Sequence, residues 1–292
     1  MNSSSPETGS ARSIDIAVVV NDSPISAFQK WIMVLVAASV VMDGFDVQAI
    51  GFVAPAVVSD WGIAKGLLGP VFGAGLIGML LGSLALSIVS DRIGRRPVLI
   101  GSTLLFGACM LATAAAQDLT QLLIARLVTG IGLGGVMANA IALVVEFSPQ
   151  RRRVTLMMWV SCGFTAGAVL GGIVSALLIP IGGWRSVFIV GGIVPLLIAA
   201  LMLRHLPESM HFLLLKQRDM GLVAGYIARI APHFSLGPNP SFSTHKPASQ
   251  NTPLKSLFVE GRALKTLLLW GINFMNLLNL FFLANWLPTL IV

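Results

Sequence analysis

The stretch WIMVLVAASVVMDGFDVQAIGFV (Trp31–Val53) is almost entirely apolar, yet it carries two aspartates. A helix needs about 20 mostly apolar residues to cross about 30 Å of hydrocarbon, and this stretch exceeds that length. Six further stretches meet the same criterion: 69–89, 97–116, 121–145, 155–179, 185–203 and 264–289. The sequence therefore predicts an all-α integral membrane protein with seven spans.

The composition agrees with a membrane protein. The 292 residues are 55% hydrophobic and 11% charged, whereas a soluble domain averages about 25% charged residues. This balance excludes an ordinary cytosolic enzyme, a disordered chain and a nucleic-acid-binding protein. Cys109 and Cys162 lie in apolar stretches, and all four histidines fall between positions 205 and 245. We therefore expect no metal site and no cofactor, and no nucleophile or phosphate-loop motif indicates an enzyme.

The distribution of Lys and Arg predicts the orientation in the membrane. With the N-terminus in the cytoplasm, sixteen of these residues lie on the cytoplasmic side and two, Lys65 and Arg185, lie on the other. Arg126 alone falls within a span. The net charge of +7 is then explained by contact with anionic lipid, without any nucleic acid. We expect a multi-pass protein of the bacterial inner membrane.

The spans and polar stretches divide the chain into four parts. They are a cytoplasmic N-terminal tail (1–30), a six-helix bundle (31–203), a cytoplasmic loop (204–263) and a seventh helix (264–292). Within the loop, the stretch His211–Ala231 is amphipathic and predicts a helix at the cytoplasmic surface. A solvated surface helix is favoured there over a partner-binding site.

Two carboxyl groups in the first span are the first candidate functional residues. Asp43 and Asp46 are three positions apart and share one helix face with Ser39. A charge inside a span costs roughly 2.5–3.5 kcal/mol on insertion scales, so each is a functional candidate. Two neighbouring carboxylates in a low dielectric do not both ionise easily. A carboxyl group that can gain and lose a proton near neutral pH is what a proton-coupled carrier requires. The structural alternative is that one aspartate pairs with a buried base or caps a helix break at Gly44.

Arg126 in the fourth span lies at a similar depth. At about 1.5 Å per residue, Asp46 and Arg126 both lie roughly 10 Å from the outer ends of their spans. The two residues can therefore pair, provided that the helices touch. A guanidinium at this depth is also a bidentate partner for a substrate carboxylate. The sequence leaves open whether Arg126 binds substrate or forms a structural pair with Asp46.

Side-chain amides are further candidates for substrate binding. Asn139 follows Gly130 and Gly134 in the fourth span, where the glycines predict close helix packing. An unpaired amide in hydrocarbon is costly, so we expect Asn139 to face a cavity or a partner helix. In the seventh span, Asn276 and Asn279 lie among aromatic residues. They either bind an aromatic ring and its hydroxyls or form interhelical hydrogen bonds.

A charge cluster lies in the cytoplasmic turn between the second and third spans. The turn SDRIGRRP (Ser90–Pro97) holds one acid and three arginines, and Glu146 and Glu208 lie on the same side of the membrane. Such a cluster can hold helices together in one conformation and release them in another. The alternative, a positive-inside signal alone, requires neither Asp91 nor Glu146.

These stretches resemble a known family. DRIGRR (Asp91–Arg96) looks like the signature loop of the major facilitator superfamily, and RLVTGIGLGG (Arg126–Gly135) resembles its span-four motif. LPESMHFLL (Leu206–Leu214) resembles the segment that follows its sixth helix. Within the superfamily, DGFDVQAIGFVAPAVVSDWGI (Asp43–Ile63) resembles the aromatic acid:proton symporters, the group that contains 4-hydroxybenzoate transporters.

The resemblance implies a fold and a set of roles. It implies twelve helices in two halves, of which this chain holds the N-terminal six-helix bundle plus helix 7, so the chain is expected to be truncated. It implies monomeric, proton-coupled uptake of an aromatic carboxylate such as 4-hydroxybenzoate. The proton-coupling residues would be Asp43 and Asp46. The substrate-binding residues would be Arg126, Asn139, Asn276 and Asn279. The conformational latch would be Asp91, Arg92, Gly94, Arg95, Arg96 and Glu146.

Three alternatives stay open beside this interpretation. The first is a major facilitator carrier of another metabolite or a sugar, and the second is an inactive truncated transporter. The third is a seven-helix receptor or light-driven pump, suggested by the span count alone. A retinal pump needs a lysine midway along helix seven, whereas Lys265 sits at its start.

Overall fold

The structure is a computed structural model, and it describes residues 14–216, 219–233, 242–243, 258 and 262–291. Side chains of α10 are described as far as residue 283. The elements in chain order are β1 (Ile14–Asp15), α1 (Ile16–Asp22), α2 (Ala27–Trp61), η1 (Lys65–Leu68), α3 (Gly69–Ile93), α4 (Arg95–Ala114), α5 (Leu119–Gly134), α6 (Val136–Phe147), α7 (Gln150–His205), α8 (Met210–Leu215), α9 (Met220–Ile230), β2 (Phe242–Ser243) and α10 (Ala263–Ile291).

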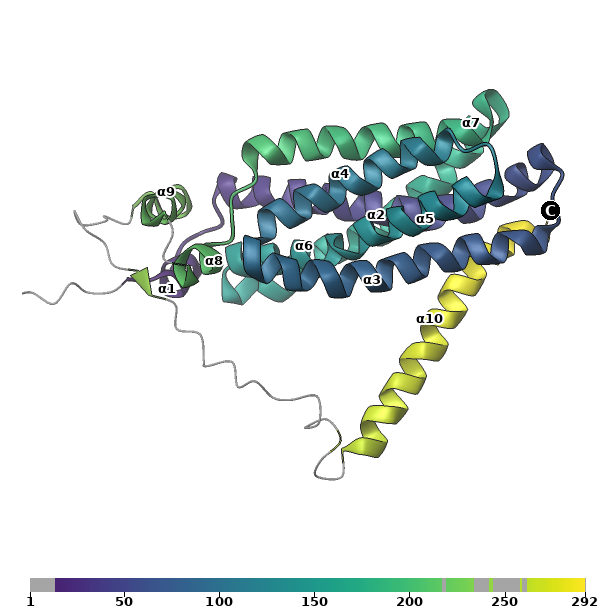
Figure 1. The fold of residues 1–292 in the computed structure, drawn as a ribbon. Coiled ribbons are helices and arrows are strands. Elements are labelled where there is room, and N and C mark those ends of the chain that lie inside the picture. The colour runs from purple at the N-terminus through teal and green to yellow at the C-terminus, as the bar shows by residue number, and fades with distance from the viewer. Residues whose placement is uncertain (1–13, 217–218, 234–241, 244–257, 259–261, 292) are drawn as a thin grey trace, which may run out of the picture.

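The predicted all-α membrane architecture is confirmed. Within the described part of the chain, six helical segments are long and apolar enough to cross a membrane. One of them, α7, has 56 residues, or about 84 Å at 1.5 Å per residue, which is more than twice a bilayer's hydrocarbon thickness. Gly183 has φ 69° and ψ 179° and divides α7 into two antiparallel spans. The chain turns back at this point (Figure 1). The predicted seven spans are therefore all present.

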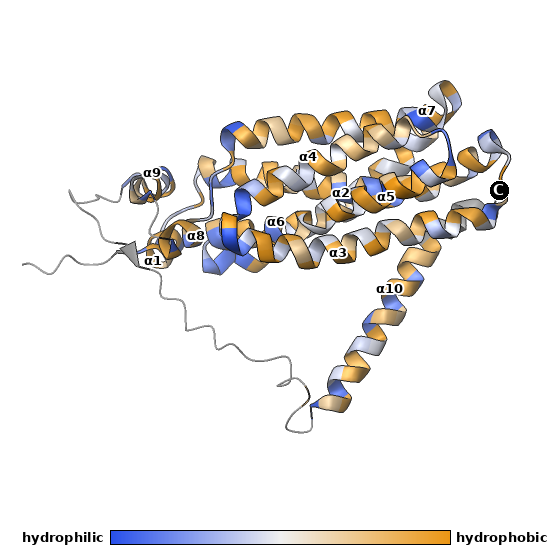
Figure 2. Ribbon diagram, in the orientation of Figure 1, coloured by the Kyte–Doolittle hydropathy of each residue, from blue (hydrophilic) through white to orange (hydrophobic). Residues whose placement is uncertain are grey.

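Helices α2 to α7 form one elongated bundle in which α2 lies against α7 and α3 lies against α5 (Figure 1). Small residues allow the second contact, as the spacing of Gly130 and Gly134 predicts. A Cβ atom on Gly130 would run into the carbonyl oxygen of Gly75, and one on Gly134 would run into that of Met79. The bundle's outer faces are apolar, as expected for contact with lipid (Figure 2).

The seventh span, α10, leaves this bundle. Its C-terminal part meets α2 and α3, and the rest of the helix extends away from them (Figure 1). None of the most apolar window of α10 is buried, whereas 67% of the corresponding window of α2 is. The apolar side chains of α10 therefore have no cover among the described residues over most of the helix.

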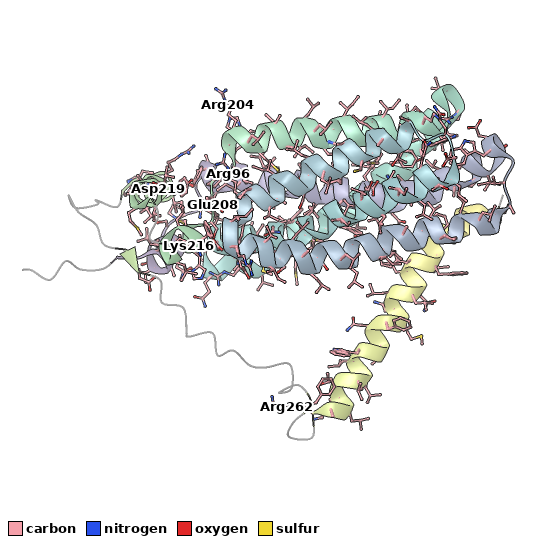
Figure 3. All side chains as sticks on the ribbon, in the orientation of Figure 1. Arg96, Arg204, Glu208, Lys216, Asp219 and Arg262 are labelled. Carbon is pink, nitrogen blue, oxygen red and sulfur yellow. The ribbon has the colours of Figure 1, made fainter. Side chains whose placement is uncertain are left out.

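Charged side chains gather at one end of the bundle. Figure 3 shows Arg96, Arg204, Glu208, Lys216 and Asp219 together at the end where α8 and α9 lie. The opposite end holds η1 and the turn at Gly183. The two ends correspond to the sides that the Lys and Arg count distinguishes.

The polar segments contain more structure than the sequence predicts. The amphipathic stretch 211–231 contains most of α8, which ends at Leu215, and all of α9, which begins at Met220. Asp219, just before α9, has a left-handed φ of 47°. The N-terminal tail holds α1, whose Ile16, Val19 and Val20 are buried. Helix α1 packs on α9, and β1 pairs in parallel with β2. The described part of the stretch 211–231 therefore holds two short helices rather than one.

Candidate functional site

A buried ion pair lies in the middle of the bundle. Arg126 of α5 donates from Nη1 to Oδ1 of Asp46 in α2, at 2.8 Å. Both side chains are 4% exposed. Breaking a buried pair by removing one partner leaves an uncompensated charge at a cost of about 3–5 kcal/mol. The structure therefore realises the pairing that the similar depths of the two residues allow.

Neutral groups complete the surroundings of the guanidinium. Arg126 Nη2 donates to Oγ1 of Thr113 in α4 at 3.0 Å, and to Oγ1 of Thr129 in α5 at 3.5 Å. The guanidinium carbon also lies 5.0 Å from the ring centroid of Phe188 in α7, a cation–π distance. Four helices thus hold one cation, and Nε has no hydrogen-bond partner among the described residues.

Asp43 lies one turn before Asp46 on α2 and is 2% exposed. Its Oδ1 is buried and accepts no hydrogen bond from the part of the chain that the structure describes. Burial without a partner disfavours the charged form of a carboxyl group. Between the two acids, a Cβ atom on Gly44 would run into the carbonyl oxygen of Phe164 in α7. Gly44 therefore serves close packing of α2 on α7 and marks no helix break, since α2 continues to Trp61.

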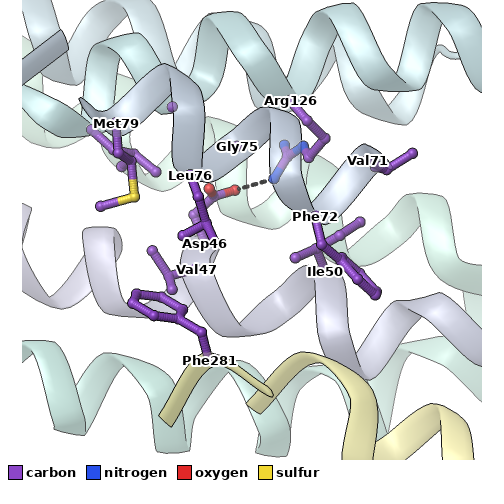
Figure 4. A pocket seen from close by; sticks show the side chains of 12 residues that line it. Asp46, Val47, Ile50, Val71, Phe72, Gly75, Leu76, Met79, Arg126 and Phe281 are labelled. Atoms are coloured by element: carbon purple, nitrogen blue, oxygen red, sulfur yellow. Dashed lines mark hydrogen bonds and ion pairs between the residues drawn. The ribbon is translucent and has the colours of Figure 1, made fainter. Parts of the chain in front are cut away.

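A pocket opens beside the ion pair, between α2, α3, α5 and α10 (Figure 4). The volume that a water-sized molecule can reach in it is about 40 Å³, within about 390 Å³ of space that includes open solvent. Asp46 and Arg126 line it together with apolar side chains, among them Phe72, Met79 and Phe281. An apolar wall with a few convergent polar groups is the usual character of a small-molecule site.

The three amide residues do not join this pocket. Asn139 is buried in α6, and its side-chain amide donates to the carbonyl of Gly135 in the preceding turn at 2.7 Å. Asn276 and Asn279 are exposed on α10. The structure thus brings Asp46 and Arg126 together, places Asp43 one helical turn from Asp46, and leaves the amides elsewhere.

At the end of the bundle where α8 lies, two acids hold the start of α4. Arg95 Nε lies 3.3 Å from Glu146 of α6. Glu208 Oε1 accepts from the backbone N–H groups of Arg95 (3.0 Å) and Arg96 (3.1 Å). Helix α4 has no side-chain cap of its own, so Glu208 satisfies the first N–H groups and places a negative charge at the positive end of the helix dipole. Ser209 links both acids, since its Oγ donates to Glu146 and its N–H donates to Glu208.

These residues form a group that we call the α4 cluster: Arg95, Arg96, Glu146, Glu208 and Ser209. The α4 cluster contains only part of the predicted latch. Of the predicted latch residues, Gly94 also lies at this cluster. Its φ of 108° favours glycine, and a Cβ atom there would run into the Glu208 carboxylate. Asp91 and Arg92 are exposed in the last turn of α3 and make no hydrogen bond or ion pair with described residues. The sequence places acids and bases on this side, and the fold selects Glu208 in place of Asp91.

Four contributing residues lie outside the predicted site. Thr113, Thr129 and Phe188 surround Arg126, but each is an ordinary residue type for a span. Only the three-residue spacing of Arg126 and Thr129 along one helix could have indicated a contact. Glu208 is part of the stretch LPESMHFLL, so its signal is present in the sequence.

Comparison with known proteins shows that the relatives of this chain are transporters. The model of the family described as Major Facilitator Superfamily matches residues 36–292. The 4-hydroxybenzoate transporter PcaK of Pseudomonas putida is 39% identical over 281 residues, which cover 96% of this chain and 62% of that protein. A gallate transporter of Pseudomonas putida is 38% identical, over 95% of this chain and 62% of that protein. The chain spans less than two thirds of the length of these relatives.

A solved structure shares the fold. The partially occluded, inward-open xylose transporter XylE from E. coli superposes with a TM-score of 0.63 at 20% sequence identity. The match covers 70% of this chain and 55% of that one. At this identity the likeness concerns the fold alone.

Proposed function

The chain belongs to the major facilitator superfamily, a family of transporters and not of enzymes, and on that premise we propose that it takes part in proton-coupled uptake of aromatic carboxylates such as 4-hydroxybenzoate. The observation that carries the proposal is the buried Arg126–Asp46 pair on the wall of an apolar pocket. The names of the relatives, a 4-hydroxybenzoate and a gallate transporter, support the substrate class.

The mechanism follows from charge balance around Arg126. In the empty state Asp46 neutralises the guanidinium through Nη1. When Asp46 takes up a proton, the ion pair loses its negative partner, and the carboxylate of an incoming substrate replaces it on Nη1. Loss of the proton restores the Asp46 carboxylate, which then displaces the substrate. The guanidinium faces one carboxylate in either state, so no uncompensated charge is left in a low dielectric.

The other pocket residues suit an aromatic substrate. Phe72 and Phe281 line the pocket beside the ion pair, and aromatic rings favour offset or edge-to-face contact with another ring. Asp43, one turn away without a partner for its Oδ1 among the described residues, is the second proton-binding group in this proposal. Each proton that enters down the membrane potential supplies about 2.3 kcal/mol per 100 mV.

The remaining assignments complete the proposal. Residues 31–203 form the N-terminal half of the carrier, residues 204–263 the cytoplasmic loop, and residues 264–292 the first helix of the second half. The N-terminus is cytoplasmic, as the sixteen-to-two distribution of Lys and Arg indicates. The α4 cluster, on the cytoplasmic side in this proposal, links the start of α4 with α6 and with the residues just before α8. It holds these segments together in one conformation of the transport cycle.

Ligand-induced stabilisation tests the recognition of the carboxylate. We expect 4-hydroxybenzoate to raise the melting temperature of the purified protein, since a ligand at 100 times its Kd stabilises the native state by about 2.7 kcal/mol. The neutral analogue 4-hydroxybenzamide has nearly the same shape and lacks the charge that Arg126 would bind. An equal increase with both compounds would show that the guanidinium does not recognise a carboxylate.

A further inference from the structure

The two threonines beside Arg126 are oriented as hydrogen-bond acceptors. Thr113 Oγ1 donates its proton to the carbonyl of Cys109 at 2.8 Å, and Thr129 Oγ1 donates to the carbonyl of Ala125 at 2.7 Å. A hydroxyl has one proton and two lone pairs. Because both protons are used within the helices, each hydroxyl presents a lone pair to Arg126 Nη2.

The guanidinium therefore has two kinds of partner on two different nitrogens. Nη1 binds Asp46, whose charge depends on protonation, whereas Nη2 binds hydroxyls that do not titrate. Thr113 is the closer hydroxyl, at 3.0 Å against 3.5 Å for Thr129. The contact to Thr113 also reaches across to a separate helix, α4, while Thr129 belongs to the same helix as Arg126.

We propose that Thr113 is a positioning residue that keeps the Arg126 guanidinium in place while Asp46 is exchanged for the substrate carboxylate. The inference rests on the proposed function, and it adds a residue that acts through Arg126 and touches no substrate itself. With Nη2 held by Thr113, loss of the Asp46 charge leaves Nη1 at the pocket, ready for the incoming anion. Without Thr113 the guanidinium is free to move with whichever carboxylate is present.

Few other described groups can hold Arg126 in this way. The ionisable side chains that interact with the guanidinium are Asp46 from α2 and the thiol of Cys109 from α4, while α7 contributes the uncharged ring of Phe188. Thr113 itself is 0% exposed, so no water competes for the contact at its surface.

Transport kinetics provide the first test, in cells that express the gene encoding this chain. Thr113→Val keeps the shape of the side chain and removes the acceptor. We expect it to raise the apparent KM for 4-hydroxybenzoate about tenfold, the effect of losing a hydrogen bond to a charged group, while the maximal rate changes less than about twofold. Thr113→Ser restores the hydroxyl and should recover most of the loss. A variant that merely folds poorly would lower the maximal rate and leave KM unchanged.

Thr103 offers a matched control on the same helix. It is also 0% exposed and also donates to a backbone carbonyl, that of Leu99 at 2.8 Å. Thr103→Val therefore removes the same type of intrahelical bond without touching Arg126, and KM should stay within about twofold of wild type. Equal KM values for the two valine variants would overturn the proposal.

Melting temperatures of the purified protein provide a test that needs no substrate. Thr113→Val should lower the melting temperature more in an Asp46→Asn background than in wild type, because Thr113 is then the nearest remaining partner of the cation. Thr103→Val should lower it equally in both backgrounds. If Thr113→Val behaves like Thr103→Val, the anchoring role is wrong. If wild type transports no aromatic carboxylate, the proposed function is wrong, and these temperatures still decide whether Thr113 anchors Arg126.

Discussion

Arg126 and Asp46 are 80 positions apart in the chain, and they form a 2.8 Å ion pair at the centre of the bundle. The pair joins α5 to α2, and it is the described ion pair with the most deeply buried side chains, since Arg95–Glu146 and Arg185–Asp60 are far more exposed. Helix α2 lines the pocket with Asp46 and also packs against α7. The ion pair therefore lies where the candidate site adjoins the tightly packed part of the bundle.

The requirement for a guanidinium that binds two partners at position 126 is open to a direct test. Arg126→Lys keeps the charge, but an ammonium group cannot reproduce two planar donors that reach Asp46 and Thr113 at once. We expect uptake of 4-hydroxybenzoate to fall at least about tenfold. The matched control is Arg185→Lys, because Arg185 pairs with Asp60 at 3.1 Å with 42% and 48% exposed side chains. Exposed pairs contribute about 0–1 kcal/mol, so this variant should transport normally. Normal uptake by Arg126→Lys would show that transport does not need a guanidinium with two simultaneous partners.

The two aspartates of α2 should differ in their effect on stability. Asp46→Asn removes the partner of a buried cation and should lower the free energy of unfolding by about 3–5 kcal/mol. Asp43→Asn changes a side chain without an ion pair among the described residues, and the amide has nearly the same shape, so we expect less than about 1 kcal/mol. Denaturation of the detergent-purified variants measures both. Equal losses would mean that Arg126 does not depend on Asp46 for its counter-charge.

In the α4 cluster, Glu208 should matter more for folding than Asp91 does at the neighbouring end of α3. Glu208→Ala leaves the first N–H groups of α4 without their acceptor and should destabilise the protein by about 1 kcal/mol, the typical cost of a lost helix cap. Asp91 is exposed and has no partner in the described structure, so Asp91→Asn should leave the melting temperature unchanged. Amide hydrogen exchange at the start of α4 would locate the effect. Faster exchange there in Asp91→Asn than in Glu208→Ala would contradict this account of the cluster.

Glycines at the contact of α3 with α5 should not tolerate a methyl group. Gly130→Ala places a Cβ against the carbonyl of Gly75, and overpacking of this kind costs about 1–3 kcal/mol. At Gly101 in α4, a Cβ atom would meet no described atom within 4 Å. Gly101→Ala should therefore be neutral or slightly stabilising, since alanine favours a helix by about 1 kcal/mol over glycine. A thermal melt in detergent compares the two, and an equally stable Gly130→Ala would mean that α3 and α5 lie farther apart.

Much of the fold is predictable from the sequence because the bilayer restricts the possibilities. Apolar length alone locates every span, and the predicted boundaries 69–89 and 264–289 lie within α3 and α10. The similar depths of Asp46 and Arg126 allow them to pair, but the contact itself depends on α2 lying near α5, which the sequence leaves open. The predicted spans 155–179 and 185–203 both lie within α7, whose 56 residues are too many for one membrane crossing and are divided at Gly183.

The remaining features depend on helix rotation and on neighbours that the sequence does not specify. Asn139 bonds to its own helix, and Asn276 and Asn279 lie on a helix that leaves the bundle. Thr113 contacts Arg126 only because α4 turns that face toward α5. Glu208 takes the place expected for Asp91 in the α4 cluster because the chain after α7 folds back over the start of α4. Such contacts require the relative positions of the helices.

Accumulation of labelled 4-hydroxybenzoate under an imposed proton gradient is the decisive measurement of whether the exchange at Arg126 and Asp46 is coupled to proton entry. Cells expressing the gene that encodes this chain should concentrate the compound when the outside is acidic, and a protonophore that collapses the gradient should abolish the accumulation. Arg126→Lys cells, with the protein present at the wild-type level, should lose it as well. Uptake that continues unchanged after the gradient has collapsed would contradict coupling of the Arg126–Asp46 exchange to protons.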